Sequence, residues 1–246
     1  MIEIIEDYMS RFPHDGYLHY HAPRYSSLLC FIKEVYKKKD CVLDIGRSRL
    51  TEIISDALKT PVDSLGFHPD SDTTSGKHYH FDLNNCQTVK SWLRDIGPYD
   101  VIIFAEVIEH LYTSPNLIFS FLNSITSHGG RVILQTPNAV ALHKRLKMLI
   151  GKNPYERIRE NNSNPGHFRE YTKKEIMEYA QNTGFKIKKS VYENYFDYRF
   201  LSHTSNSMSC KPQQKLFNYI YSLCPGFFKP GMTLVLVKEH ESDFLL

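Results

Sequence analysis

Short apolar runs alternate along this chain with segments whose apolar positions recur at helical spacing. Seven runs have the length and the bounding turn residues of buried strands: 41–46, 62–67, 78–83, 99–107, 129–137, 185–191 and 232–238. Amphipathic helices are predicted over residues 26–37, 50–58, 88–96, 115–126 and 172–182. Strands separated by helices are typical of βαβ units. The pattern therefore predicts an α/β fold with a doubly wound, Rossmann-like, mostly parallel seven-stranded sheet.

The ends of two predicted helices carry specific sequence signals. Pro115 suits the first turn of the helix over 115–126. Thr172 is placed as an N-cap, Glu175 completes a capping box, and Gly184 ends that helix. Right-handed crossovers put the ligand crevice of such a sheet at the carboxyl ends of its strands. The ends to consider are residues 44–46, 67–68, 82–83, 105–106 and 135–136.

No internal repeat and no linker rich in Gly, Ser or Pro divides the chain, so residues 1–246 are predicted to form a single domain. Three segments fall outside the strand–helix rhythm. They are a helical N-terminal cap (1–38), a basic, amphipathic lid insert (139–165) and an aromatic-rich insert before the last strand (192–230).

Composition narrows the class of protein. The chain has 41% hydrophobic and 23% charged residues, which is ordinary for a globular protein, and a net charge of +3, which gives no reason to expect nucleic acid as partner. Its five cysteines lack metal or disulfide spacing, and Cys41, at the start of an apolar run, suits a buried thiol. We find neither a signal-peptide pattern nor an apolar run of ~18 residues, and expect a cytoplasmic protein.

The first chemical signal is Asp44-Ile45-Gly46 at a strand-to-helix turn. A glycine there lets the backbone approach a ligand, and the following helix N-terminus favours anionic groups. An ordinary turn explains the same three residues equally well.

The order of further motifs resembles a known family. VLDIG (42–46), FDL (81–83), YDVIIFAEVIEHL (99–111), GGRVILQTPN (129–138) and GHFREYTKKEI (166–176) follow one another as in the class I S-adenosylmethionine-dependent methyltransferases. The similarity is greatest to the ubiquinone-methyltransferase-like branch. Residues 136–176 resemble branch members from glycan and glycolipid pathways.

The resemblance implies S-adenosylmethionine as cofactor and suggests where it binds. Asp44 and Gly46 match the motif around the methionine part of the cofactor, and Asp82 and Leu83 match the pair beside the adenine. Ala105 and Glu106 match the strand end that faces cofactor and substrate.

Two positions depart from the family pattern. Ser48 and Leu50 replace motif glycines, and Arg47 either pairs with the cofactor's carboxylate or fills its space. Phe67 and His68 stand at or next to the position of the acidic residue that usually binds the ribose hydroxyls.

A second constellation, Glu106-x-x-Glu109-His110, follows the fourth strand. It resembles strings in metal-using relatives, namely ubiquinone-pathway O-methyltransferases and small-RNA 2′-O-methyltransferases, and His167 stands where the latter have a further His. These four residues are candidate ligands of a divalent metal, which is the less favoured interpretation. The favoured one has no metal, with Glu106 at the reacting centre and His110, or second His167, taking a hydroxyl proton.

The two inserts bear on partners. The segment 144–159 carries six Lys and Arg residues against Glu156 alone, so it can hold substrate phosphates, contact an anionic membrane surface or form a solvated lid. The aromatics of 192–200 and 217–228 can wall an acceptor pocket, form a homodimer face or fill the core.

The sequence thus predicts an S-adenosylmethionine-dependent enzyme that methylates an oxygen of a sugar or lipid-linked glycan. Two alternatives stay open. One is a non-catalytic, methyltransferase-like scaffold, and the other is metal-dependent RNA 2′-O-methylation.

Overall fold

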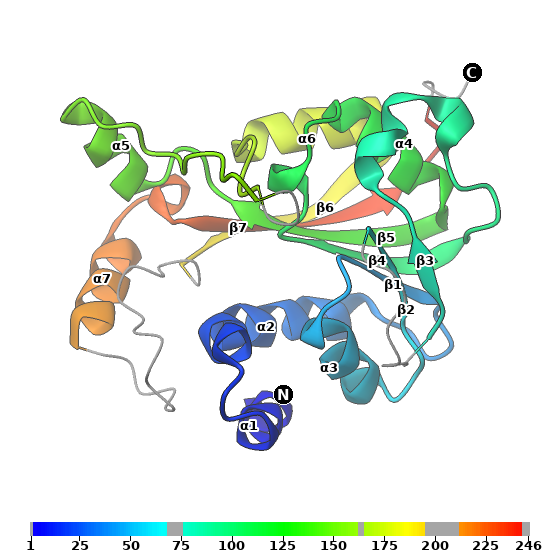
Figure 1. The fold of residues 1–246 in the computed structure, drawn as a ribbon, viewed down its shortest axis with the longest axis horizontal. Coiled ribbons are helices and arrows are strands. Elements are labelled where there is room, and N and C mark those ends of the chain that lie inside the picture. Colours follow the sequence, from blue (N-terminus) through cyan, green and yellow to red (C-terminus); the bar gives the residue numbers. More distant parts are fainter. Residues whose placement is uncertain (1, 68–75, 162–164, 195–211, 243–246) are drawn as a thin grey trace.

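A seven-stranded sheet runs through the centre of the molecule (Figure 1). The structure is a computed structural model that describes residues 2–67, 76–161, 165–194 and 212–242. The strands are β1 (Val42–Ile45), β2 (Asp63–Gly66), β3 (His78–His80), β4 (Tyr99–Ala105), β5 (Thr126–Pro137), β6 (Phe185–Glu193) and β7 (Gly231–Lys238). They lie in the order β3-β2-β1-β4-β5-β7-β6, and β7 runs antiparallel to both of its neighbours. The prediction of a mostly parallel, doubly wound sheet is confirmed.

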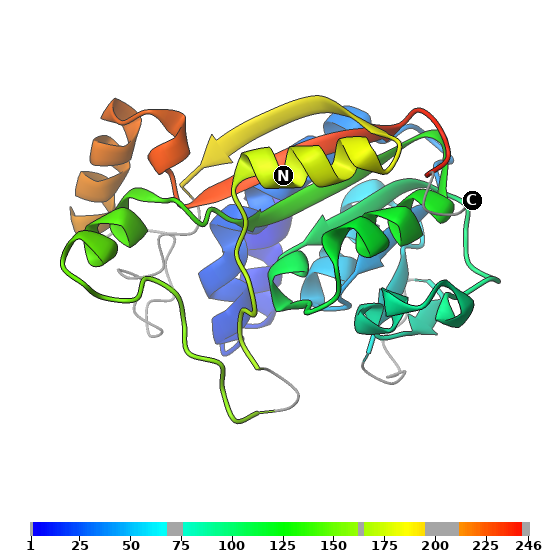
Figure 2. The same ribbon diagram turned by 90° about the horizontal axis from the view of Figure 1, so that it is seen from above.

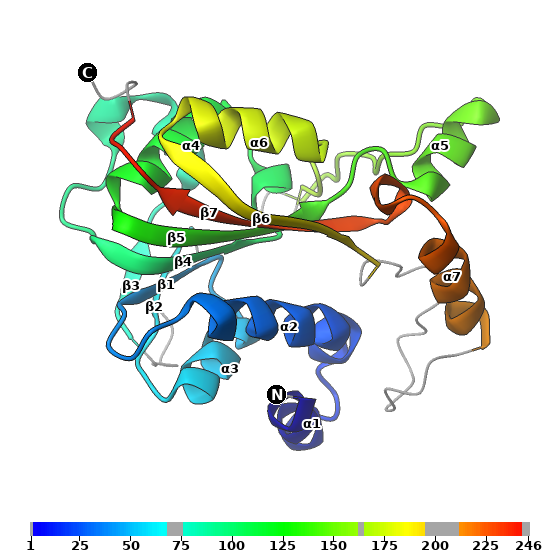
Figure 3. The same cartoon turned by 180° about the vertical axis from the view of Figure 1, so that it is seen from behind.

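Helices cover both faces of the sheet (Figures 1 and 3). One face carries α1 (Ile2–Arg11), α2 (Gly16–Val35) and α3 (Arg49–Leu58), and the other carries α4 (Pro115–Ser124) and α6 (Lys173–Asn182). Each face of the sheet packs against its helices in a separate hydrophobic core, and alternate side chains of one strand point into the two cores. Val101 and Ile103 of β4 pack with α2 and α3, and Ile102 and Phe104 pack with α4.

Two further helices lie outside these layers. Figure 2 places α5 (Leu142–Leu149) and α7 (Pro212–Leu223) at one end of the molecule, beyond the helices that cover the sheet. They belong to the inserts predicted at 139–165 and 192–230, of which residues 162–164 and 195–211 lie outside the described part. No helix among the described residues is long and apolar enough to cross a membrane.

The helix-end signals are confirmed. Pro115 is the first residue of α4. Thr172 caps α6 in a capping box with Glu175, and Gly184 adopts φ +87° just past its end. The helix predicted from residue 26 begins earlier, at Gly16, where the Asp15 side chain accepts from the Leu18 N–H.

The helix predicted over 88–96 is wrong. The chain instead forms the 3₁₀ turns η1 (Leu83–Gln87) and η2 (Val89–Ser91). Trp92 explains the difference, because its Nε1 donates to the Cys86 carbonyl at 3.1 Å while the indole packs edge-on against Phe121. This anchoring fixes Trp92 without a regular helix.

The expectation for Cys41 is also wrong, because this cysteine is exposed just before β1. The apolar run becomes buried only from Val42 onward, where the strand enters the sheet. Cys86 is a buried thiol in the described part of the chain.

Candidate active site

The carboxyl ends of β1, β2 and β4 bring most of the predicted cofactor residues to one edge of the sheet. Asp44 and Gly46 come from β1 and the turn after it, and Phe67 follows β2 with its ring half exposed. Ala105 ends β4 and is half-buried. His68 lies outside the described residues.

Gly46 forms a tight turn that a larger residue does not fit. Its φ is +90°, its N–H donates to the Leu65 carbonyl at 2.9 Å, and a Cβ there would lie 3.2 Å from a methyl of Val107. Only glycine adopts this φ without strain. The turn therefore keeps its backbone open, as the family motif requires.

Asp44 is buried and accepts a hydrogen bond of 2.6 Å from the Thr51 hydroxyl of α3. Burial raises the pKa of Asp44 to about 7, and the Thr51 hydrogen bond and the charge of Arg24 oppose the rise. A carboxyl poised near neutrality responds strongly to any further charge at this edge.

The departures from the family glycines have structural roles. Ser48 is the N-cap of α3 and accepts from the Leu50 N–H, while Thr51 bonds back to the Ser48 N–H at 3.1 Å. Leu50 is buried in the core beneath α2. These two residues hold the helix N-terminus in place, and Arg47 is half-buried beside them.

Asp82 and Leu83 follow β3, as predicted. The Asp82 carboxylate accepts from the Asn84 N–H at 2.9 Å and so starts the η1 turn. Leu83 is buried in the core. The acidic group thus lies in a fixed orientation at the same sheet edge.

Helix α2 adds a cation that the sequence reasoning did not select. Arg24 is buried, its charge lowers the pKa of both Asp44 and Glu106, and its Nε donates to His21 Nδ1 at 3.3 Å. Burial and Arg24 lower the pKa of His21 to about 2, so His21 is a neutral acceptor. In the sequence, only the i+3 spacing of Arg24 from His21 indicates this pair.

Glu106 occupies a strained position directly after β4. Its φ is +57°, which is uncommon for a residue with a side chain, and its buried Oε1 has no hydrogen-bond partner among the described residues. Burial, and then the neighbouring Glu109, raise the pKa of Glu106 well above its ordinary value. A buried carboxyl oxygen without a hydrogen-bond partner can accept a hydrogen bond from a ligand that binds at this position.

The structure brings Glu109, His110 and His167 together, with ligand atoms within 4.8 Å of one another. Glu106 is not part of this group. The buried Glu109 accepts from the Thr136 hydroxyl through Oε2 at 2.9 Å, and its Oε1 has no partner in the described chain. The His110 and His167 rings meet edge-on with centroids 4.8 Å apart.

Both histidines are oriented through Nδ1. His110 Nδ1 lies 2.9 Å from the Gly166 carbonyl, and His167 Nδ1 lies 3.2 Å from Glu170 Oε1. A carbonyl or carboxylate oxygen can only accept, so each proton sits on Nδ1 and each Nε2 keeps its lone pair. Burial lowers the pKa of His167, which favours its neutral form.

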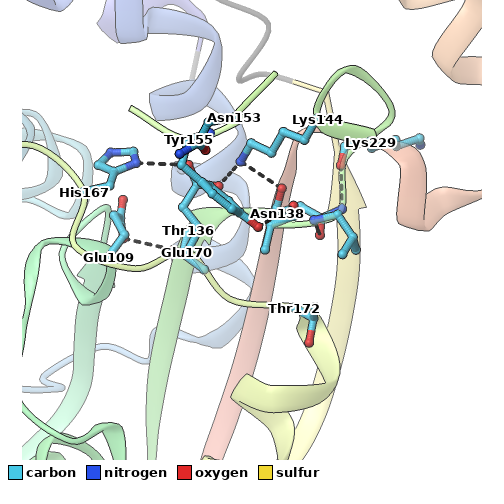
Figure 4. Close-up of polar contacts among 12 residues, drawn as sticks. Glu109, Thr136, Asn138, Lys144, Asn153, Tyr155, His167, Glu170, Thr172 and Lys229 are labelled. Atoms are coloured by element: carbon cyan, nitrogen blue, oxygen red, sulfur yellow. Dashed lines mark hydrogen bonds and ion pairs between the residues drawn. The ribbon is translucent and has the colours of Figure 1, made fainter. Parts of the chain in front are cut away.

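Lys144 of α5 was expected among the solvated residues of the lid but is buried beside this cluster (Figure 4). Its ammonium forms an ion pair with Glu170 and donates to the Asn138 carbonyl at 3.0 Å. Lys144 thus adds a basic group near Glu109 and His167, and burial lowers its pKa to about 7. No local signal distinguishes Lys144, because it stands in a run of basic residues.

A doubly wound sheet with acidic residues and a glycine turn at the carboxyl ends of its strands is typical of Rossmann-like enzymes, which bind nucleotide cofactors there. Comparison with protein families matches residues 17–190 to the family described as a methyltransferase domain, and the chain belongs to this family. It is therefore a methyltransferase enzyme. The scaffold alternative is not supported.

Solved structures agree with this fold. A SAM-dependent methyltransferase from Archaeoglobus fulgidus is 16% identical with a TM-score of 0.51, over 87% of this chain and 94% of its own. The N-methyltransferase NodS from Bradyrhizobium japonicum, in complex with S-adenosylhomocysteine, is 9% identical with a TM-score of 0.52, over 90% and 88%.

The 1,6-didemethyltoxoflavin-N1-methyltransferase from Burkholderia thailandensis is 12% identical with a TM-score of 0.55, over 97% of this chain and 88% of its own. At these identities the likeness concerns the fold alone. A comparison with curated protein sequences gives no match.

Proposed function

We propose that this enzyme transfers the methyl group of S-adenosylmethionine to a hydroxyl oxygen of a sugar or lipid-linked glycan. The observation that supports oxygen is the pair of histidines with protonated Nδ1 and basic Nε2 atoms. A hydroxyl needs such a base to take its proton as the oxygen attacks. The resemblance of residues 136–176 to glycan-pathway members of the ubiquinone-methyltransferase-like branch supports the acceptor class.

The cofactor's charged groups find partners at the sheet edge. Bound S-adenosylmethionine supplies an electrophilic methyl carbon with a neutral thioether as leaving group. Arg24 offers a buried guanidinium to the cofactor's carboxylate, with Arg47 as the alternative, and Glu106 offers its unpartnered Oε1 to a cationic group. The Gly46 turn leaves room for the backbone to approach.

His110 is the first candidate for the base, and His167 is the second. As the acceptor oxygen attacks the methyl carbon opposite sulfur, the C–S electron pair moves to sulfur and the hydroxyl proton moves to Nε2. Glu170 orients the His167 ring, while Lys144 neutralises Glu170 and so limits how strongly it stabilises a protonated His167. This arrangement favours His110 as the proton acceptor.

Methyl transfer from radiolabelled S-adenosylmethionine to monosaccharides, glycosides and a short RNA tests the proposal. We expect an alkali-stable label in sugar ethers, and about 10²-fold slower turnover in His110→Ala with unchanged S-adenosylhomocysteine affinity. His128→Ala, which changes an exposed histidine of β5, is the matched control. Label on RNA alone, or full turnover in both His110→Ala and His167→Ala, would contradict it.

A second proposal concerns a divalent metal. Glu109, His110 and His167 would hold it, since Glu109 Oε1 and the two Nε2 atoms fit its donor set, and it would polarise an acceptor hydroxyl. We favour the metal-free interpretation because the Lys144 amino group already pairs with Glu170 and interacts electrostatically with Glu109, which opposes the lowering of its pKa to about 7 by burial. Two experiments distinguish the metal-dependent from the metal-free interpretation. They are calorimetric titration with Zn²⁺ and Mg²⁺, and measurement of turnover after chelation. Loss of turnover that Zn²⁺ or Mg²⁺ restores would favour the metal.

A further inference from the structure

Helix α5 has two faces of opposite character. Lys144 is buried and points toward Glu170 and Asn138, beside the candidate site (Figure 4). At about 100° per residue, Leu146, Leu149 and Ile150 lie on the opposite side of the helix. They point to solvent, with Leu149 81% and Ile150 67% exposed. This is the reverse of a surface helix that packs its apolar side on the core.

The exposed apolar surface continues beyond α5. The same end of the molecule (Figures 1 and 3) carries α7, and we call the whole the α5–α7 surface. Arg145 of α5 joins the two inserts, with its guanidinium 5.6 Å from the Phe227 ring centre and 5.3 Å from that of Phe228. The large apolar residues exposed on α5, at its C-terminal end, on α7 and shortly after it are Leu146, Met148, Leu149, Ile150, Leu216, Tyr219, Leu223 and Phe227. Isolated exposed apolar residues need no explanation, but a group of this size marks an interaction surface.

Basic residues alternate along the sequence with the apolar residues of α5 and of the segment after it. Lys147, Lys152 and Arg157 are exposed, whereas the exposed Arg159 is paired with Glu156. Aliphatic side chains flanked by Lys and Arg are typical of surfaces that lie in the headgroup region of an anionic bilayer.

We propose that the α5–α7 surface binds the enzyme to the surface of an anionic membrane. A second copy of the chain fits less well, because a two-fold contact brings this basic patch against itself. Single-stranded nucleic acid uses aromatic stacking platforms, whereas the most exposed side chains of α5 are aliphatic. The inference concerns where the enzyme works and does not depend on the acceptor proposed above.

Vesicle flotation tests this with the full chain. We expect binding to phosphatidylcholine vesicles that contain about a third phosphatidylserine, weak binding to pure phosphatidylcholine, and a steep loss with salt. Leu149→Glu combined with Ile150→Glu, and separately Lys147→Glu combined with Lys152→Glu, should each weaken binding by more than about tenfold.

Two matched controls lie elsewhere on the surface. Val89→Glu changes an exposed apolar residue of η2, and Lys38→Glu changes an exposed cation before β1. Both should bind vesicles as the wild type does, and all variants should keep the wild-type circular dichroism and S-adenosylhomocysteine affinity.

The proposal would be overturned by a lack of binding to anionic vesicles, by equal binding of the α5 variants, or by a dimer that the α5 variants dissociate in the absence of vesicle binding. Binding of a single-stranded RNA without vesicle binding would likewise overturn it.

Discussion

At the residue scale, Arg24 and Lys144 are buried basic residues that lie beside the carboxyl groups of the proposed site. Asp44, Gly46 and Glu106 were identifiable because strand ends and turns leave local signals. Arg24 and Lys144 were not, because their importance comes from burial beside distant carboxylates. A linear pattern does not encode which lysine of a basic run turns inward.

Gly46→Ala should weaken S-adenosylhomocysteine binding. The positive φ costs about 1–2 kcal/mol of folding free energy for a residue with a Cβ, and this Cβ also meets Val107. Gly129→Ala has a similar φ of +70° and open space around it, so it shares the strain without the contact. Calorimetry should therefore find reduced affinity in Gly46→Ala only. Equal affinities in both variants would mean that the turn does not shape the cofactor site.

His21 makes folding stability depend on pH. Its pKa in the folded chain is about 2, so below its ordinary value of 6.5 the unfolded chain takes up a proton that the folded chain does not. The free energy of unfolding therefore falls by about 1.4 kcal/mol per pH unit as pH drops below 6.5. Asp44 acts in the opposite direction, because its folded pKa lies above its ordinary value.

His21→Asn keeps an acceptor for Arg24 but cannot take up a proton. Urea unfolding at several pH values should show the wild type losing stability relative to this variant below pH 6.5. A difference that stays constant with pH would show that His21 titrates normally.

At the element scale, sequence signals at helix ends predicted the structure correctly where the residues involved lie within one helical turn of each other. The α6 capping box and Pro115 were predicted because neighbours along the chain make these contacts. The helix over 88–96 failed because the Trp92 contacts to Cys86 and Phe121 override the helical spacing. For α5, the amphipathic pattern was predicted but the inward direction of Lys144 was not.

Thr172→Ala should lower the unfolding free energy by about 1 kcal/mol, because Thr172 Oγ1 accepts from the Glu175 N–H at 3.3 Å. Thr172→Ser keeps the hydroxyl and should lose much less. Thermal or urea unfolding of the two variants measures the cap directly. Equal losses would point to the methyl group rather than the hydrogen bond.

At the scale of the whole molecule, the fold and the enzyme class were predicted, because seven strand patterns and ordered motifs extend over most of the chain. The single-domain organisation, the cytoplasmic location, the homodimer and the lack of a nucleic-acid partner stay predictions. They depend on surfaces and surroundings that hydrophobic patterning does not describe.

Cofactor binding should stabilise the entire fold, because the proposed site joins α2, the β1 turn and the end of β4. S-adenosylhomocysteine at about a hundred times its Kd should add about 2.7 kcal/mol to the unfolding free energy. Differential scanning calorimetry with increasing ligand measures this as a rising midpoint. A midpoint that stays constant at millimolar ligand would contradict the proposed site.

The position of β7 has a consequence for how the chain is made. Residues 231–238 form β7, which pairs with β5 on one side and β6 on the other. Because β7 is synthesised after both of these strands, neither can form its pairing with β7 until the end of the chain has left the ribosome. Until then β5 and β6 present unpaired backbone edges, which are prone to aggregate. A nascent chain that stops before Gly231 is therefore a substrate for chaperones or proteases rather than a smaller enzyme.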